Sequence, residues 1–279
     1  MLRTLANLDR RWIYVLVFAS AIVPMILHVK LPSAAPSTNV IALYRQIQSL
    51  PDGSTVLASF DFEAGGETEL GPLALVTLRQ LFRKKCHVLA LALWPIGSTE
   101  ARKYLGLVAS EFKKEGHPLT NGVDYVNLGY KPGGQIVIRQ MESGFSTAFP
   151  TDVDGRPYDS IPMLAKVNSF RDVSFVLSYS VGTPGIKEWV NVLTTDYGLK
   201  VGGGVTAVSA PEMMPYLDSG QVTGLASGLR GAADYETLVG QPGPATLGMT
   251  VQNFVHLLIL LLIFTSNVVY FLGRRRRRG

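Results

Sequence analysis

The chain contains one cysteine, Cys86, and few charged residues for its length. A single cysteine cannot form an internal disulfide, so the protein is not a disulfide-stabilised scaffold. Asp, Glu, Lys and Arg make up 17% of the 279 residues, against roughly 25% in an average soluble domain. The 28 glycines follow no collagen-like period, and 47% hydrophobic residues exclude a disordered chain. The apolar excess must therefore be buried in a core or in a membrane.

Common catalytic motifs are also absent from the sequence. It has no Gly-x-Ser-x-Gly, no P-loop, no His-Glu-x-x-His, and no Gly-x-Gly-x-x-Gly after the first predicted strand. The four histidines, His28, His87, His117 and His256, are scattered along the chain. One cysteine and dispersed histidines offer no zinc ligand set. Whether the protein is an enzyme stays open from the sequence.

Two uncharged apolar stretches lie near the ends of the chain, at residues 12–29 and 254–272. As helices, each would cover the roughly 30 Å hydrocarbon core of a bilayer. We therefore predict two membrane-spanning helices, with Trp12, Tyr14 and Tyr270 at the membrane interfaces. The first is predicted to be an uncleaved signal anchor, and a cleaved signal peptide is the alternative.

Arginines flank both predicted spans. Arg3, Arg10 and Arg11 precede the first span, and Arg274–Arg278 follow the second. The positive-inside rule then makes residues 1–11 and 273–279 cytoplasmic and the central region extracytoplasmic. Residues 30–250 include 18 basic and 20 acidic residues, so the pI of 9.3 comes from the two ends. We expect an integral protein of a bacterial or archaeal inner membrane, in contact with lipid and without a nucleic-acid partner.

The central region, residues 39–239, has the length of one globular domain, with linkers predicted at 30–38 and 240–253. Short apolar strands alternate with helical patterns along it. Strands are predicted at 55–62, 87–94, 123–128, 173–180 and 204–209, and helices at 69–84, 98–115 and 184–197. This alternation predicts a doubly wound, mostly parallel α/β sheet that is Rossmann-like or flavodoxin-like.

A last long helix is predicted from near Pro211 or Tyr216 to beyond Tyr235. Gly220, Gly224 and Gly228 recur every four residues along it. Small residues at this spacing form a face that another backbone can approach closely. Either the domain's own sheet or a second subunit would pack against this face.

Three polar residues, Asn253, His256 and Asn267, lie in or beside the second predicted span. Polar side chains at this depth usually form hydrogen bonds with a neighbouring helix. Together with the glycine face, they favour a homo-oligomer or a larger membrane complex.

Candidate ligand-binding residues follow the predicted strands, because ligands of open parallel sheets bind at the carboxyl ends of the strands. They are Asp61, Glu63, Glu67, Lys131, Ser180 and Thr183. The three acidic residues could hold a divalent cation or a ligand amine, with Lys131 as the counter-charge. The alternative is a solvated acidic loop that favours the positive end of the following helix.

Two further local features have structural alternatives. Ser98 and Thr183 are predicted to cap helix N-termini. The segment 149–162 contains three prolines and three aspartates and is predicted to be a loop. This loop either closes over a site as a lid or covers one edge of the sheet.

Three functions are compatible with the sequence. We favour a membrane-anchored extracytoplasmic α/β domain that acts as a ligand- or partner-binding subunit of an oligomeric membrane complex. The first alternative is a membrane-tethered hydrolase that uses Ser180 or the Asp61 and Glu63 carboxylates. The second is a purely structural anchor or assembly protein.

Overall fold

The computed structural model describes residues 9–27, 29 and 35–276. Residues 1–8, 28, 30–34 and 277–279, among them Arg3, His28 and the last arginines of the tail, lie outside the described residues. The chain divides into two compact units. The first is the α/β domain, which extends to Ala245, and the second comprises α2 (Arg10–Ile26) and the part of α11 (Pro244–Arg276) from Thr246 onward.

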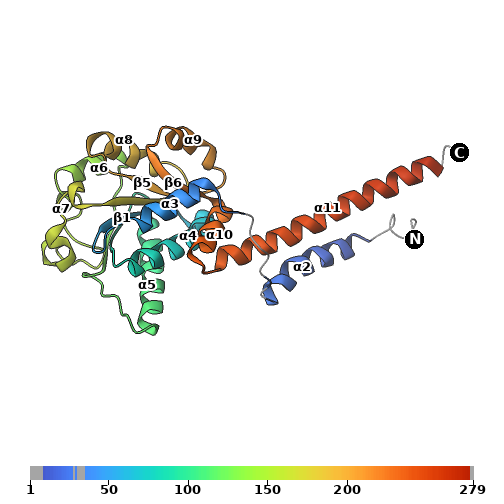
Figure 1. Ribbon diagram of the computed structural model, residues 1–279, viewed down its shortest axis with the longest axis horizontal. Helices are drawn as coiled ribbons and strands as arrows, with labels where there is room; N and C mark the ends of the chain where they lie inside the picture. The colour runs from blue at the N-terminus through green and yellow to red at the C-terminus, as the bar shows by residue number, and fades with distance from the viewer. Residues whose placement is uncertain (1–8, 28, 30–34, 277–279) are drawn as a thin grey trace. The chain divides into compact units, whose positions relative to one another are not determined.

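Six parallel strands form one sheet in the α/β domain (Figure 1). They are β1 (Thr55–Asp61), β2 (His87–Ala92), β3 (Tyr125–Tyr130), β4 (Phe175–Ser180), β5 (Val201–Val205) and β6 (Val222–Ser227). Their spatial order is β3-β2-β1-β4-β5-β6, which is the Rossmann order and not the flavodoxin order. The predicted parallel α/β sheet is thus confirmed, and one of its two alternatives is selected.

Helices cover both faces of this sheet, as the apolar runs of the strands require (Figure 1). One face carries α3 (Thr38–Gln48), α4 (Ala64–Arg83), α5 (Gly97–Lys114) and α10 (Gly228–Val239). The other carries α6 (Gln135–Glu142), α7 (Phe145–Ala148), α8 (Ile186–Asp196), α9 (Ala210–Asp218) and three short 3₁₀ turns, Tyr158–Ser160, Pro162–Lys166 and Phe170–Asp172. On this second face, Trp189 of α8 is fully buried in a hydrophobic core cluster.

The prediction of one long helix beyond Pro211 is wrong. The segment forms α9, then the edge strand β6, then α10. Gly220 and Gly228 have φ angles of +75° and +61°, which fit turns and break a helix. Gly224 lies within β6, where an added Cβ would come within 2.2 Å of the Leu43 backbone nitrogen. The three glycines therefore share no helix face, and the assembly argument drawn from them loses its basis.

The segment 149–162 is hydrogen-bonded to β3, an edge strand of the sheet. The N–H of Val153 donates to the Asn127 carbonyl of β3. Asp152 is buried, and its carboxylate accepts from the backbone N–H groups of Asp154 and Arg156 and from the Arg156 guanidinium. The loop thus covers an edge strand, as one of the two sequence alternatives expected.

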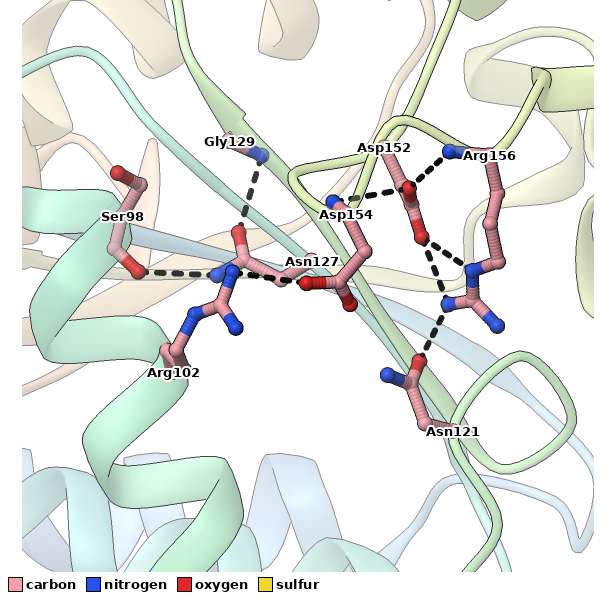
Figure 2. Close-up of polar contacts among 8 residues, drawn as sticks. All are labelled: Ser98, Arg102, Asn121, Asn127, Gly129, Asp152, Asp154 and Arg156. Carbon is pink, nitrogen blue, oxygen red and sulfur yellow. Dashed lines mark hydrogen bonds and ion pairs between the residues drawn. The ribbon is translucent and has the colours of Figure 1, made fainter.

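Two further contacts hold this loop to its surroundings. Arg102 of α5 donates to Asp154 at 2.8 Å, and Arg156 donates to the Asn121 side chain at 2.7 Å (Figure 2). Beneath the loop, the Asn127 side chain donates to the Ser98 carbonyl and accepts from the Gly129 N–H. The loop is therefore fixed to α5 as well as to β3.

Helix α11 is long and apolar enough to cross a membrane. Its apolar part, Pro244–Phe271, has 28 residues, and an 18-residue window within it has a mean hydropathy of 2.2. Because α11 begins at Pro244, most of the predicted linker 240–253 is helical. The described part of the first predicted span forms α2, a helix of 17 residues with Pro24 inside it.

Candidate ligand-binding cleft

The order in which strands are added to the sheet reverses at the neighbouring strands β1 and β4. From β1 the sheet grows through β2 and β3 on one side, and from β4 through β5 and β6 on the other. Asp61 and Ser180, the last residues of β1 and β4, are register partners at this point. Ligands of doubly wound sheets bind beside such a topological switch point, at the carboxyl ends of the strands.

A cleft of about 570 Å³ opens at this end of the sheet. Its walls come from the turns after β2, β3 and β4 and from the first turns of α6 and α8. The lining residues are Leu93, Trp94, Pro95, Tyr130, Gly133, Gly134, Gln135, Thr183, Pro184 and Glu188. The volume lies in the range of small-molecule sites, roughly 300–1,000 Å³.

Hydrogen bonds fix two walls of the cleft. The indole N–H of Trp94 donates to the Pro184 carbonyl at 2.7 Å and so ties the β2 turn to the β4 turn. The Glu188 carboxylate accepts from the Gly185 N–H at 2.6 Å and caps the start of α8. This cap replaces the one predicted for Thr183, which is exposed at the cleft.

A glycine pair shapes the third wall. Gly133 and Gly134 precede α6 with φ angles of +126° and +51°, and no side chain caps this helix. A Cβ at Gly134 would lie 3.1 Å from the Pro184 ring. The close approach of the β3 turn to the β4 turn therefore depends on glycine.

Beneath the cleft, Asp61 is fully buried in a polar pocket of the core. Its Oδ2 accepts from the Ser59 hydroxyl at 2.6 Å and from the Ser178 hydroxyl at 3.4 Å. Its Oδ1 accepts from the backbone N–H of Leu93 at 2.7 Å. Asp61 thereby binds the backbone of a cleft residue, although its own side chain does not line the cleft.

Burial raises the pKa of Asp61 from 3.8 to about 7. The hydrogen bonds from Ser59, Leu93 and Ser178 and the neighbouring Trp189 indole lower this pKa but do not compensate for the lost hydration. The buried indole N–H of Trp189 has no hydrogen-bond partner of good geometry among the described residues. Asp61 is therefore a buried acid that titrates near neutrality.

The predicted cation site does not form. Glu63 is exposed and makes no capping bond to α4, while Glu67 pairs with Lys103 and accepts from the Tyr104 hydroxyl at 3.1 Å. Hydrogen bonding to Lys103 lowers the pKa of Glu67. Across the described ranges, no three His, Cys, Asp or Glu side chains are grouped to hold a metal ion. Asp61 is fully buried at the end of β1, whereas Glu63 precedes α4 and Glu67 lies in its first turn.

Lys131 is not the counter-charge of the acidic residues. Its ammonium group donates to the Ala148 carbonyl at the end of α7. A lysine side chain is long enough to reach either the acidic residues or the Ala148 carbonyl, so the sequence could not distinguish these two contacts.

Ser180 is buried, and its hydroxyl oxygen accepts from the Ile186 N–H at the start of α8. It therefore has a structural contact and is not presented to the cleft. Ser98, predicted as a cap, lies inside α5, which begins at Gly97 without a side-chain cap. Of the six predicted site residues, Thr183 alone lines the cleft.

The remaining lining residues escaped the prediction because most are apolar or small. Trp94 ends the predicted strand 87–94, Tyr130 follows the predicted strand 123–128 by two residues, and Gly133 and Gly134 come soon after. Charged and hydroxyl side chains are the usual guide to a polar ligand site, and these residues have neither a charge nor an aliphatic hydroxyl. An aromatic residue at the end of a strand is the sequence signal that points to this cleft.

Comparison of the chain with protein-family models, with curated proteins and with solved structures found no match.

Proposed function

We propose that the α/β domain binds a small organic ligand in the cleft at the carboxyl ends of β2, β3 and β4, and that the terminal helices hold it at a membrane. The observation that carries the proposal is the cleft itself, with about 570 Å³ of space beside the switch point. Its walls are already joined by the Trp94 to Pro184 hydrogen bond. A site preformed in this way loses little entropy on binding.

The lining favours a ligand with a flat apolar part. Trp94, Pro95, Tyr130 and Pro184 offer rings against which such a group stacks. Thr183, Gln135 and Glu188 supply hydroxyl, amide and carboxylate groups at the same cleft. The expected ligand therefore combines a ring with hydrogen-bonding substituents.

A dinucleotide is disfavoured, although the strand order is that of Rossmann-type sheets. Such ligands place a pyrophosphate at the N-terminus of the first crossover helix. Here that helix is α4, and Glu63 and Glu67 stand at its start. Two carboxylates repel a phosphate group.

The hydrolase alternative has little support from the site geometry. The Ser180 hydroxyl is buried against the start of α8. His87 and His117 line a different cleft, at the amino ends of β1 to β3. Ser180 therefore has neither a histidine base from these positions nor an open face for substrate.

Membrane anchoring is the second part of the proposal. The length and hydropathy of α11 support a span, and the apolar sequence 12–29 supports another. The arginines outside both stretches favour cytoplasmic termini and an extracytoplasmic domain, as in a bacterial or archaeal inner membrane. In this arrangement the protein is a binding subunit of a membrane complex.

Ligand binding is tested on the full chain in detergent micelles. We expect at least one compound from a panel of indole, L-tryptophan, adenosine and uridine to raise the thermal unfolding midpoint and to change Trp94 fluorescence. Tyr130→Ala should abolish both responses, because Tyr130 lines the cleft. Leu107→Ala is the matched control, since Leu107 is also exposed but lies on α5 outside the cleft. A response that survives Tyr130→Ala, or no response to any compound, would contradict the proposed site.

A further inference from the structure

Six residues of α11 recur at seven-residue intervals along one side of the helix. Asn253, Leu260 and Asn267 form one series, and His256, Ile263 and Tyr270 form a second series three residues later. Alternating intervals of three and four residues are the a and d positions of left-handed helix pairs. We refer to these six residues as the α11 seam.

The α11 seam is uncovered in the structure. All six of its side chains are exposed. The half-buried residues of the same stretch, including Leu258, Leu262, Thr265 and Val269, lie on the opposite side of the helix. The chain thus covers one side of α11 in part and leaves the seam free.

A bilayer makes an uncovered polar seam costly. Asn and His side chains in hydrocarbon need hydrogen-bond partners, because no water is available to them. The described part of α2 carries Trp12, Tyr14 and Ser20, and the Ser20 hydroxyl already donates to the Val17 carbonyl. Among the described residues, none of these three side chains forms a hydrogen bond with the seam. The part of the chain that the structure describes therefore leaves the polar groups of the seam without a partner, and a second chain can supply one.

We infer that the partner is a second copy of α11, packed parallel to the first along the seam. This inference rests on the membrane placement of α11 under the proposed function. Copies in one membrane share one orientation, so a two-fold axis brings Asn253 to Asn253 and Asn267 to Asn267. An amide group both donates and accepts, which makes each such pair self-complementary.

Spacing also favours an identical partner. Asn253 and Asn267 are 14 residues apart, about 21 Å along a helix at 1.5 Å per residue. An unrelated helix would need polar groups at the same separation, whereas a second copy has them by symmetry. Asparagine at an a position is also a known device for fixing register and the number of helices.

Disulfide crosslinking of the full chain in native membranes tests the inference. In a Cys86→Ser background, Leu260→Cys places a thiol in the seam, and Leu261→Cys places one at an equally accessible site on another side of α11. We expect oxidation to convert most of the Leu260→Cys chain to a dimer and little of the Leu261→Cys chain. Equal crosslinking at both positions, no dimer at either, or a crosslink to a different protein would overturn the pairing.

Fractionation of the same samples tests the membrane placement of α11 separately from the pairing of its two copies. If the chain is recovered in the membrane and Leu260→Cys does not crosslink, the pairing is wrong and the membrane placement stands. If the chain is recovered in the soluble fraction, both are wrong.

Substitution of the seam amides provides a second readout. We expect Asn253→Leu and Asn267→Leu each to weaken dimerisation in detergent by about threefold, the typical strength of one interhelical hydrogen bond. Thr265→Leu, on the side of the helix opposite to the seam, should leave the dissociation constant unchanged. An unchanged constant in both asparagine variants would show that the amides do not meet.

Discussion

The Oδ1 atom of Asp61 accepts a hydrogen bond of 2.7 Å from the backbone N–H of Leu93. Asp61 ends β1, and Leu93 is the first residue after β2, where it lines the cleft. A buried carboxyl group with a pKa of about 7 therefore holds the backbone at one wall of the proposed ligand site.

The stability of the domain should depend on pH through Asp61. The pKa of this group is about 7 in the folded chain and 3.8 when it is freely hydrated. Between these values the folded chain retains a proton that the unfolded chain has released. The free energy of unfolding therefore falls as pH rises from about 4 to about 7, by a contribution on the order of 4 kcal/mol.

Asp61→Asn isolates this contribution, because the amide keeps an acceptor for Leu93 and cannot ionise. We expect the thermal unfolding midpoint to fall further in the wild type than in the variant between pH 5 and pH 8. All other titrating groups are common to the two proteins and cancel in the comparison. Equal falls would show that Asp61 does not titrate near neutrality.

The Glu67 to Lys103 ion pair should contribute little and should have the opposite pH dependence. Lys103 lowers the pKa of Glu67, so the contribution is present above the unfolded pKa of about 4.5 and is lost as pH falls through the lower folded value. Both side chains are about a third or more exposed, which limits the contribution to less than about 1 kcal/mol. Glu67→Gln should reduce stability by this amount at pH 7 and by nothing near pH 2.

Glu63→Gln is the control for this experiment. Glu63 stands four residues earlier, is exposed and makes no capping bond. Its substitution should leave urea unfolding unchanged at both pH values. A larger loss in Glu63→Gln than in Glu67→Gln would contradict the assigned pairing.

Gly224→Ala should strongly destabilise the domain. The new Cβ would lie 2.2 Å from the Leu43 nitrogen and 2.5 Å from the Leu43 Cα, so α3 would have to move away from β6. Displacement of packed backbone costs about 3 kcal/mol. Gly106→Ala on α5 meets no atom within 4 Å and should stabilise the domain by up to about 1 kcal/mol. Denaturant unfolding of the two variants should give shifts of opposite sign.

Asp152→Ala should release the loop from the β3 edge. It removes a buried carboxylate that accepts from two backbone N–H groups and from Arg156. We expect a loss of about 2 kcal/mol and faster amide hydrogen exchange at Val153. Asp154→Ala breaks only the exposed pair with Arg102 and should cost less than about 1 kcal/mol. Unchanged exchange at Val153 in Asp152→Ala would show that other contacts hold the loop.

Much of the fold was predictable because buried parallel strands have a distinct sequence pattern. The run that became β2 is almost entirely apolar, four of the seven residues of β1 are apolar, and amphipathic helices follow both strands. The prediction for the segment after Pro211 was wrong because its sequence pattern fits two different structures. Glycines four residues apart fit a helix face, but the same spacing places Gly224 in a strand between two turns. Spacing could not reveal that Leu43, 181 residues earlier, packs against that strand.

The candidate site was less predictable, because charge was used as the guide to chemistry. Asp61 and Lys131 are charged in the sequence, yet the fold buries the first at the end of β1 and directs the second toward the Ala148 carbonyl. The cleft is built instead from aromatic, proline and glycine residues in three turns. Which turns meet depends on strand order, and strand order is a long-range property.

The bond from Val153 to the Asn127 carbonyl also affects how the domain behaves at high local concentration. An open edge strand is a template on which the strand of another molecule can add, and repeated addition leads to aggregates. The loop occupies part of the β3 edge and so blocks that route. Domains held at a high local concentration can therefore stay separate at this edge, and loss of Asp152 would expose the edge to neighbouring molecules.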